Sequence, residues 1–219
     1  MDMLEGIKQR KSIRCFKQEV PPKEVILECI EAATWAPSPT NQQPWQFIVA
    51  AGEELRNISE VITKVFPRRM KELDPYAGIP DACRARKDET FARLFAAAQA
   101  ENLDPKALFQ KSLAFYGAPA AVLFLTGRME MSLYRHATAA ALQTFLLAAH
   151  AKGLGTCWMS TVAACQEDIK SLLNISGDKE ILDGVALGYP VEDAPLNTFP
   201  RTRLPVREVT TLLGFETTD

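Results

Sequence analysis

Hydrophobic residues recur along the chain with two different periods, which predict an alternation of helices and strands. A helical period marks a short segment capped by Asp2 and a second segment that Pro22 opens and that ends before Pro37. The same period predicts longer helices at residues 53–64, 88–101, 131–152 and 165–173. Runs rich in β-branched or aromatic residues, or closed by a turn signal, predict strands at residues 45–50, 120–126, 154–160 and 181–187. The order is mixed, without a repeat or a linker, so we expect one domain over residues 1–219.

Two segments depart from this alternation. Residues 66–112 hold four prolines, many charges and the aromatic residues Tyr76, Phe91, Phe95 and Phe109, which predicts a helical insertion over the sheet. Residues 195–215 are too rich in proline for a regular element, yet they carry Leu204, Val206, Val209, Leu212, Leu213 and Phe215. An apolar tail without a core of its own needs another surface, such as that of a second subunit.

The predicted helix at residues 131–152 is rich in alanine and has almost no bulky face. Small side chains let helix backbones approach closely. The helix therefore lies either in the centre of the core or with one side against a twofold-related copy of the chain.

Composition places the chain among ordinary globular proteins. It has 219 residues, of which 47% are hydrophobic, and its 25 basic and 27 acidic side chains give a net charge of -2. That balance argues against a general nucleic-acid binder, because phosphate contacts need a basic face. No segment reaches the roughly 20 apolar residues of a membrane span, and the acidic start is unlike a secretory signal. We therefore expect a cytoplasmic protein without membrane contact.

Positive charge is concentrated near both ends of the chain. Residues 1–17 and residues 200–207 each carry a local charge of +3. Two small basic clusters in an otherwise acidic chain suit a compact anion better than a polymer.

Cysteine and histidine exclude several chemistries. The five cysteines are widely spaced and form no Cys-x-x-Cys pair, so neither a disulfide framework nor a zinc site is expected. His136 and His150 are interpreted as packing or surface residues rather than as a ligand or base. Since the chain has no catalytic serine, phosphate-loop or metalloprotease motif, an enzyme of this sequence would take its reactive group from a cofactor.

The basic segment at residues 10–14 is the first candidate site. Arg10, Lys11, Ser12 and Arg14 offer three cations and a hydroxyl, which can surround a phosphate. In an extended segment with Ile13 turned inward, Ser12 and Arg14 share the opposite side. The alternative is a solvated basic surface.

Two further segments hold candidate contacts. Residues 36–45, called here the polar loop, combine three prolines with Ser38, Asn41 and two glutamines, and such a rigid loop can read the polar edge of a planar heterocycle or serve as a plain connection. Residues 153–161 begin like a dinucleotide-binding motif, but Trp158 replaces the third glycine and the segment leads into a strand. Gly153 is better interpreted as a helix C-cap.

Five segments together resemble the ordered signatures of the flavin-dependent nitroreductase family. They are residues 10–14, residues 36–38 with 41–45, residues 153–158, residues 187–190 and residues 201–205. The resemblance implies an α+β fold with a mixed, mainly antiparallel sheet flanked by helices. It also implies a homodimer with FMN at the subunit interface and a C-terminal extension that wraps the partner.

The resemblance also implies individual roles for residues of this chain. Arg10, Lys11 and Ser12 would hold the FMN phosphate together with Arg201 and Arg203, and Arg14 would lie near the N1/O2 edge of the flavin. Pro37, Ser38, Pro39 and Asn41 would come from the other subunit, and Met159, Ser160 and Thr161 would line the N5/O4 side through backbone groups. This chain departs from the family pattern at Ser160 and Thr161, where glycine is common, and at Pro39.

The implied activity is NAD(P)H-dependent reduction of nitroaromatics, quinones or related electron-poor small molecules. Flavin N5 would take hydride from NADH or NADPH and pass it on, so ping-pong kinetics are expected and no catalytic side chain is required. Three alternatives remain: a specialised member, such as a reductive dehalogenase or an oxidase-type dehydrogenase; a non-catalytic flavin-binding protein; and a plain interaction domain. In the specialised member, residues 66–112 would supply the substrate contacts.

Overall fold

A single antiparallel sheet forms the centre of the protein. The computed structural model describes residues 2–72 and 76–215. The strands lie in the order β1–β2–β4–β3, and their bounds are β1 Trp45–Ala51, β2 Ala120–Gly127, β3 Gly155–Met159 and β4 Lys179–Gly188. Trp45 pairs with Thr126, and the β2–β4 register shifts between Phe124 and Leu125. All four predicted strands are confirmed, with shifts of one or two residues at their ends.

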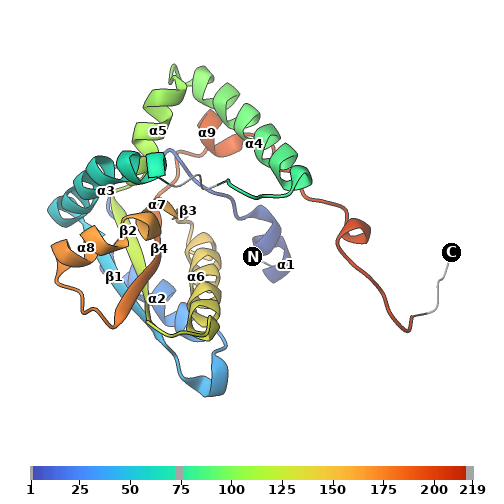
Figure 1. Ribbon diagram of the computed structural model, residues 1–219. Coiled ribbons are helices and arrows are strands. Elements are labelled where there is room, and N and C mark those ends of the chain that lie inside the picture. The colour runs from blue at the N-terminus through green and yellow to red at the C-terminus, as the bar shows by residue number, and fades with distance from the viewer. Residues whose placement is uncertain (1, 73–75, 216–219) are drawn as a thin grey trace.

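Helices cover both faces of this sheet (Figure 1). They are α1 Met3–Gln9, α2 Lys23–Thr34, α3 Gly52–Glu72, α4 Asp81–Ala100, α5 Pro105–Leu113, α6 Leu133–Ala151, α7 Thr161–Ala164, α8 Gln166–Leu173 and α9 Pro195–Thr198. Short 3-10 turns are η1 Pro39–Asn41, η2 Phe115–Gly117 and η3 Val206–Glu208. As predicted, the carboxylate of Asp2 caps α1 by accepting from the N–H groups of Leu4 and Glu5 at 3.0 and 3.2 Å.

Two hydrophobic clusters, one on each face, hold the layers together. Strand β2 supplies both, because its residues alternate between Leu123 on the α3, α7 and α8 side and Phe124 on the α2 and α6 side. Phe124 packs edge-on against Phe145 of α6, with ring centroids 5.5 Å apart. One side of α6 is buried against the sheet, which agrees with both interpretations of the alanine-rich helix. Whether its other side meets a second copy stays a prediction.

Three helices occupy most of the described residues among 66–72 and 76–112, but their boundaries differ from those predicted. Helix α3 continues through Pro67 to Glu72 instead of ending at residue 64. The proline removes one hydrogen bond to the carbonyl of Thr63, and Thr63 is exposed, so water can solvate that group. Helix α4 begins seven residues before the predicted residue 88, and Asp104 caps a separate helix, α5. Figure 1 places α4, α5 and α9 together at one end of the sheet.

The C-terminal region has two parts. The expectation that residues 195–215 form no regular element is wrong for α9, where Pro195 occupies the first turn, in which a helix needs no N–H, and Leu196 is fully buried. It is also wrong for the short turn η3. Residues 200–215, called here the C-terminal tail, are exposed throughout and extend away from the body (Figure 1).

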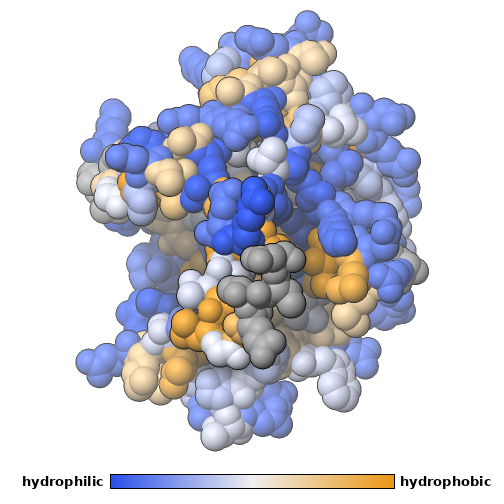
Figure 2. All heavy atoms as spheres, turned by 90° about the vertical axis from the view of Figure 1, so that its right-hand side faces the viewer, coloured by the Kyte–Doolittle hydropathy of each residue, from blue (hydrophilic) through white to orange (hydrophobic). Residues whose placement is uncertain are grey.

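Hydrophobic side chains gather on the face that carries the C-terminal tail. Figure 1 places α1 on the same side, and the view of that side in Figure 2 shows hydrophobic patches among hydrophilic atoms. Exposed residues of α1 and the tail include Met3, Leu4, Ile7, Val206, Val209, Leu212, Leu213 and Phe215. A chain that leaves this much apolar area in water offers a surface for another molecule.

Candidate functional site

The basic segment is fixed along the edge of the sheet. Ser12 forms a parallel bridge with Thr156 of β3, and the N–H of Ile13 donates to the Thr156 carbonyl at 2.8 Å. Ile13 is buried, as expected. A Cβ at Gly155 would lie 2.7 Å from the Cγ1 atom of Ile13, so glycine permits this close approach. Because the pairing is parallel, the chain runs from Arg10 towards Arg14 in the same direction as β3.

Asn197 ties this segment to the C-terminal region. Its side-chain oxygen accepts from the N–H groups of Arg14 and Cys15 at 2.7 and 3.1 Å, and its Nδ2 donates to the carbonyls of Cys15 and Val191, each at 2.8 Å. The side chain is 3% exposed. Four hydrogen bonds from one buried amide therefore hold together residues that lie 183 positions apart.

Arg201 makes a second connection between the two ends. Its guanidinium donates to three carbonyls at the end of α1: Arg10, Lys8 at 2.9 Å and Gln9 at 3.4 Å. A cation is favourable at this position because helix C-terminal carbonyls carry partial negative charge. Among the described residues, Arg203 donates only to the carbonyl of its neighbour Thr202, at 2.7 Å. The two arginines therefore differ: Arg201 is engaged by the protein backbone, and most donors of Arg203 remain available.

These connections create a cleft of about 180 Å³, called here the basic cleft. It is lined by Arg10, Lys11, Ser12, Arg14, Thr90, Arg93, Asn197, Phe199, Pro200, Arg201, Thr202 and Arg203. Among these residues there is no carboxylate. Six of the expected site residues, which come from two distant segments, thus line one cavity.

Burial and the positive charges of the cleft lower the pKa of one residue in its lining and of one residue outside it. Burial, together with the charges of Arg201 and Arg203, lowers the pKa of Arg10 from its usual value. Burial and the charges of Arg10, Arg201 and Lys11 likewise lower the pKa of His150, whose Nε2 is buried without a hydrogen-bond partner among the described residues. A bound anion would relieve this repulsion.

Arg14 lies at the border of the cleft, between aromatic rings. Its guanidinium carbon is 5.5 Å from the ring centroid of Phe199 and 5.8 Å from that of Tyr116, and Nη1 donates to the Ser12 carbonyl at 3.3 Å. Burial raises the pKa of Tyr116. Cys157 adds to this increase, and Arg14 opposes it. The buried Nε of Arg14 has no partner among the described residues. An unpaired buried donor of this kind fits a polar ligand next to the cleft.

The basic cleft fits a phosphate group by its donors and by its size. Guanidinium groups and a hydroxyl are the donors that a dianionic phosphate prefers. A volume of about 180 Å³ is below that of typical cofactor pockets, so the rest of a mononucleotide would extend beyond the cleft. Sequence reasoning missed Thr90 and Arg93 of α4, as well as Asn197, because no local motif links those positions to the basic segment.

Met159, Ser160 and Thr161 follow the same edge of the sheet beyond Arg14. Met159 ends β3 with a buried side chain, Ser160 follows it, and Thr161 begins α7. The hydroxyl of Thr161 is buried and has no hydrogen-bond partner among the described residues. None of the three lines the basic cleft, and their contact with a flavin stays a prediction.

The polar loop is not brought to the basic cleft within the chain. Ser38 Oγ accepts from the N–H of Gln43 at 3.0 Å, while Pro37 and Asn41 are exposed and Pro39 begins η1. Thr40, Asn41 and Gln43 have φ values between 46° and 58°, a costly conformation for residues other than glycine. Figure 1 shows η1 at the opposite end of the sheet from α9. Within one chain, the polar loop therefore does not contribute to this cleft.

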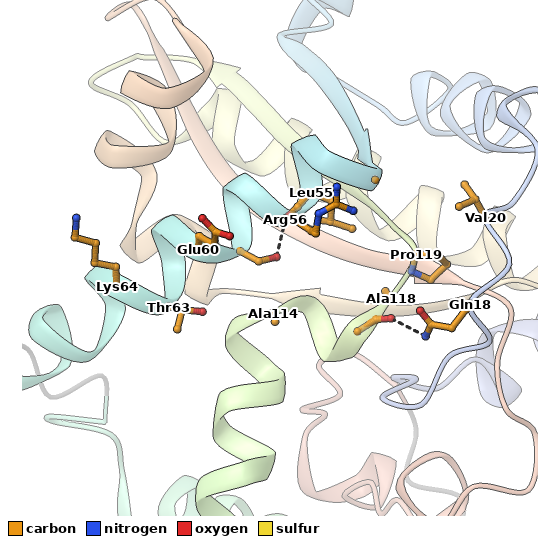
Figure 3. A pocket seen from close by; sticks show the side chains of 13 residues that line it. Gln18, Val20, Leu55, Arg56, Glu60, Thr63, Lys64, Ala114, Ala118 and Pro119 are labelled. Atoms are coloured by element: carbon orange, nitrogen blue, oxygen red, sulfur yellow. Dashed lines mark hydrogen bonds between the residues drawn. The ribbon is translucent and has the colours of Figure 1, made fainter.

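A larger cavity of about 740 Å³ lies elsewhere, between α3 and η2 (Figure 3). Arg56, Glu60 and Lys64 give it mixed charge, and Gln18 Nε2 donates across one side to the Gly117 carbonyl at 3.3 Å. None of its lining residues has a buried polar atom without a partner, so it lacks the features that mark the basic cleft. Residues 2–72 and 76–215 contain neither a cluster of metal-ligating side chains nor a helix able to cross a membrane.

Comparison with known proteins places the chain in one family. A model of the nitroreductase family matches residues 7–189, so the chain belongs to the nitroreductase family. It is 28% identical to a 4-nitrobenzoate reductase of Pseudomonas putida over 96% of this chain and 95% of that protein. It is also 28% identical to the nitroreductase NfnB of Mycolicibacterium smegmatis, over 93% and 89% of the two chains. The crystal structure of the FMN and NADPH-dependent nitroreductase NfnB from sphigopyxis sp. strain HMH superposes with a TM-score of 0.87 at 25% identity, covering 98% of this chain and 100% of that one.

Proposed function

We propose that this protein is an FMN-dependent oxidoreductase that uses NADPH or NADH to reduce nitroaromatics, quinones or related electron-poor compounds. One observation carries the proposal: residues 10–14 and 201–203 meet in a cleft whose lining is rich in cations and free of carboxylates. The relatives named above support the cofactor and the reaction class, because their names specify FMN, NADPH and nitroaromatic reduction.

In this proposal Arg10, Lys11, Ser12 and Arg203 hold the FMN phosphate. Arg201 donates to the end of α1 and keeps the basic segment in place. When bound, FMN supplies the exchange of hydride between the nicotinamide and the acceptor. Arg14 offers its unpaired Nε to the polar edge of the ring system, where a cation favours negative charge. Backbone groups of residues 159–161 would line the N5/O4 side of the flavin.

We further propose that the protein works as a homodimer, with the C-terminal tail wrapped around the partner. The exposed apolar residues of the tail support this arrangement, as does the exposed polar loop. In the dimer, Pro37, Ser38, Pro39 and Asn41 of one subunit reach the FMN of the other. We also propose that residues 66–112 contribute contacts to the acceptor, since α4 lines a second pocket that shares Arg14 and Thr90 with the basic cleft.

The decisive experiment follows the flavin absorbance of the purified protein. A flavin band is expected, which NADPH or NADH should bleach without oxygen and which a nitroaromatic compound should then restore. A colourless protein that does not take up added FMN contradicts the proposal. Bleaching that no nitroaromatic or quinone reverses excludes this acceptor class, and a bound flavin that neither nucleotide bleaches indicates a non-catalytic flavin-binding protein.

A further inference from the structure

Arg14 is held between two aromatic rings that come from different parts of the chain. Tyr116 belongs to η2, and Phe199 follows α9. The guanidinium carbon lies 5.8 Å from the first ring centroid and 5.5 Å from the second. Both distances fall within the ~6 Å at which an aromatic ring attracts a cation. We call the two rings the aromatic clamp, and they fix a guanidinium whose buried Nε has no hydrogen-bond partner among the described residues.

The turn that carries Tyr116 has an unusual backbone. Phe115, Tyr116 and Gly117 have φ values of 51°, 56° and 71°, and this left-handed region is costly for bulky side chains. The N–H of Gly117 donates to the Ala114 carbonyl at 2.9 Å and closes the turn. Phe115 is 1% exposed. The conformation thus buries one aromatic side chain in the core and places the next one over Arg14.

The surroundings of Arg14 hold its charge without neutralising it. No carboxylate lines the basic cleft or the second pocket, which are the two cavities that Arg14 borders among the described residues. Its Nη1 donates to the Ser12 carbonyl at 3.3 Å. Burial raises the pKa of Tyr116, so the phenol stays neutral at ordinary pH and offers a ring face rather than a negative charge. A cation held in this way keeps its charge for a ligand beside it.

We propose that Tyr116 is a positioning residue, which holds Arg14 at the polar edge of the FMN ring system and thereby favours the reduced cofactor. The inference rests on the proposed function, because it takes the ligand beside Arg14 to be FMN. Negative charge at that edge increases when a flavin is reduced, so a fixed cation there stabilises the reduced form more than the oxidised form. Without the ring of Tyr116, the guanidinium would be free to turn towards water, and part of this preference would be lost.

The midpoint potential of the bound FMN measures the preference without turnover. Tyr116→Leu should lower the ratio of the affinities for reduced and oxidised FMN about 5- to 10-fold, as expected for loss of a partly desolvated cation–ring contact. For a two-electron couple this corresponds to a potential about 20–30 mV more negative. Tyr116→Phe keeps the ring and should restore the wild-type potential. Phe115→Leu, the matched control, removes a more deeply buried ring from the same turn and should lower stability but not the potential.

A double-mutant cycle tests whether Tyr116 acts through Arg14. In an Arg14→Gln background, Tyr116→Leu should leave the potential unchanged. An unchanged potential in Tyr116→Leu alone, an equal decrease in the Arg14→Gln background, or the same decrease in Phe115→Leu would each overturn the assignment. Phe199→Leu removes the opposite ring without altering the strained turn. It should also lower the potential, and it takes the place of Tyr116→Leu if that variant does not fold.

NMR of the Arg14 Nε–H group separates the clamp from the proposed function. Ring currents should shift this signal whether or not FMN is bound, so Tyr116→Leu should move it and Phe115→Leu should not. Arg14→Gln identifies the signal by its loss. If the protein takes up no FMN but Tyr116→Leu moves the signal, the proposed function fails while the clamp stands. A signal that Tyr116→Leu does not move would disprove the clamp itself.

Discussion

One chain assembles the basic cleft by itself, but it leaves the polar loop exposed and away from the cleft. In the cleft, Asn197 and Arg201 connect both ends of the chain through side-chain-to-backbone hydrogen bonds. The polar loop is exposed at the opposite end of the sheet, and the C-terminal tail leaves its apolar residues in water. The comparison separates the proposed phosphate site, which one chain assembles by itself, from the contacts that the proposed dimer would add.

Removing the C-terminal tail should have the largest effect. A chain that ends at Arg203 loses six exposed apolar side chains, and each can contribute about 1.5–3 kcal/mol when fully buried. We expect the dimer dissociation constant to rise at least ~100-fold, measured by sedimentation at graded concentrations. Circular dichroism should remain native. The double variant Leu212→Ser, Leu213→Ser should weaken the dimer less; an unchanged dimer in the truncated chain would refute the role of the tail.

Asn197→Ala should disrupt the basic cleft, which is the part of the comparison that one chain assembles by itself. The substitution leaves several buried backbone groups without partners, each costing about 1–3 kcal/mol, so we expect a loss of about 3 kcal/mol in the free energy of unfolding. FMN should be lost as well, because the basic segment is released. Thr198→Ala, at the exposed neighbouring position, serves as the control in chemical denaturation. Equal stability of the two variants would contradict the assigned role of Asn197.

Packing between the basic segment and β3 can be tested at a single glycine. Gly155→Ala places a methyl group against Ile13, and overpacking of this kind costs about 1–3 kcal/mol. Gly177→Ala is the matched control, since a Cβ there meets nothing within 4 Å. We expect a lower midpoint of thermal unfolding for the first variant only. A normal midpoint for Gly155→Ala would mean that the segment is not held against β3.

The two arginines of residues 201–203 should separate phosphate binding from positioning. Arg203→Ala removes a charge-assisted contact, so FMN should bind about 10- to 100-fold more weakly with unchanged stability. Arg201→Ala should lower both FMN affinity and stability, because it also releases the carbonyls at the end of α1. Fluorescence titration with FMN and thermal unfolding of the same samples measure the two effects. Identical behaviour of both variants would remove the distinction.

The smallest expected effect concerns the protonation of His150. Neighbouring cations and burial lower its pKa, so the unfolded chain binds more protons below about pH 6.5 and the protein loses stability there. Inorganic phosphate in the basic cleft should raise this pKa by offsetting the cations. Histidine NMR titration of His136→Gln, which leaves one imidazole, reports the change directly. The same pKa with and without saturating phosphate would place the anion elsewhere.

Helical periodicity located most helices, because each buries one regular face, and runs of β-branched or aromatic residues and turn signals located all four strands. These patterns failed where tertiary context outweighs local signals: Pro67 lies within α3 because an exposed carbonyl needs no partner, and Pro195 starts α9 rather than preventing it. The two basic clusters were visible as local charge, and their convergence was expected only from the family resemblance. Asn197, Thr90 and Arg93 could not be predicted, since their roles arise from contacts across large sequence separations.

The hydrogen bond between Arg14 and Asn197 also sets an order of events during synthesis. Its donor leaves the ribosome early, whereas its acceptor follows 183 residues later, a delay of about 10–40 s at ordinary elongation rates. During that interval the nascent basic segment has neither its amide partner nor the arginines of the other end. Cofactor loading must therefore be a late, largely post-translational step, and prematurely terminated chains would accumulate without a prosthetic group.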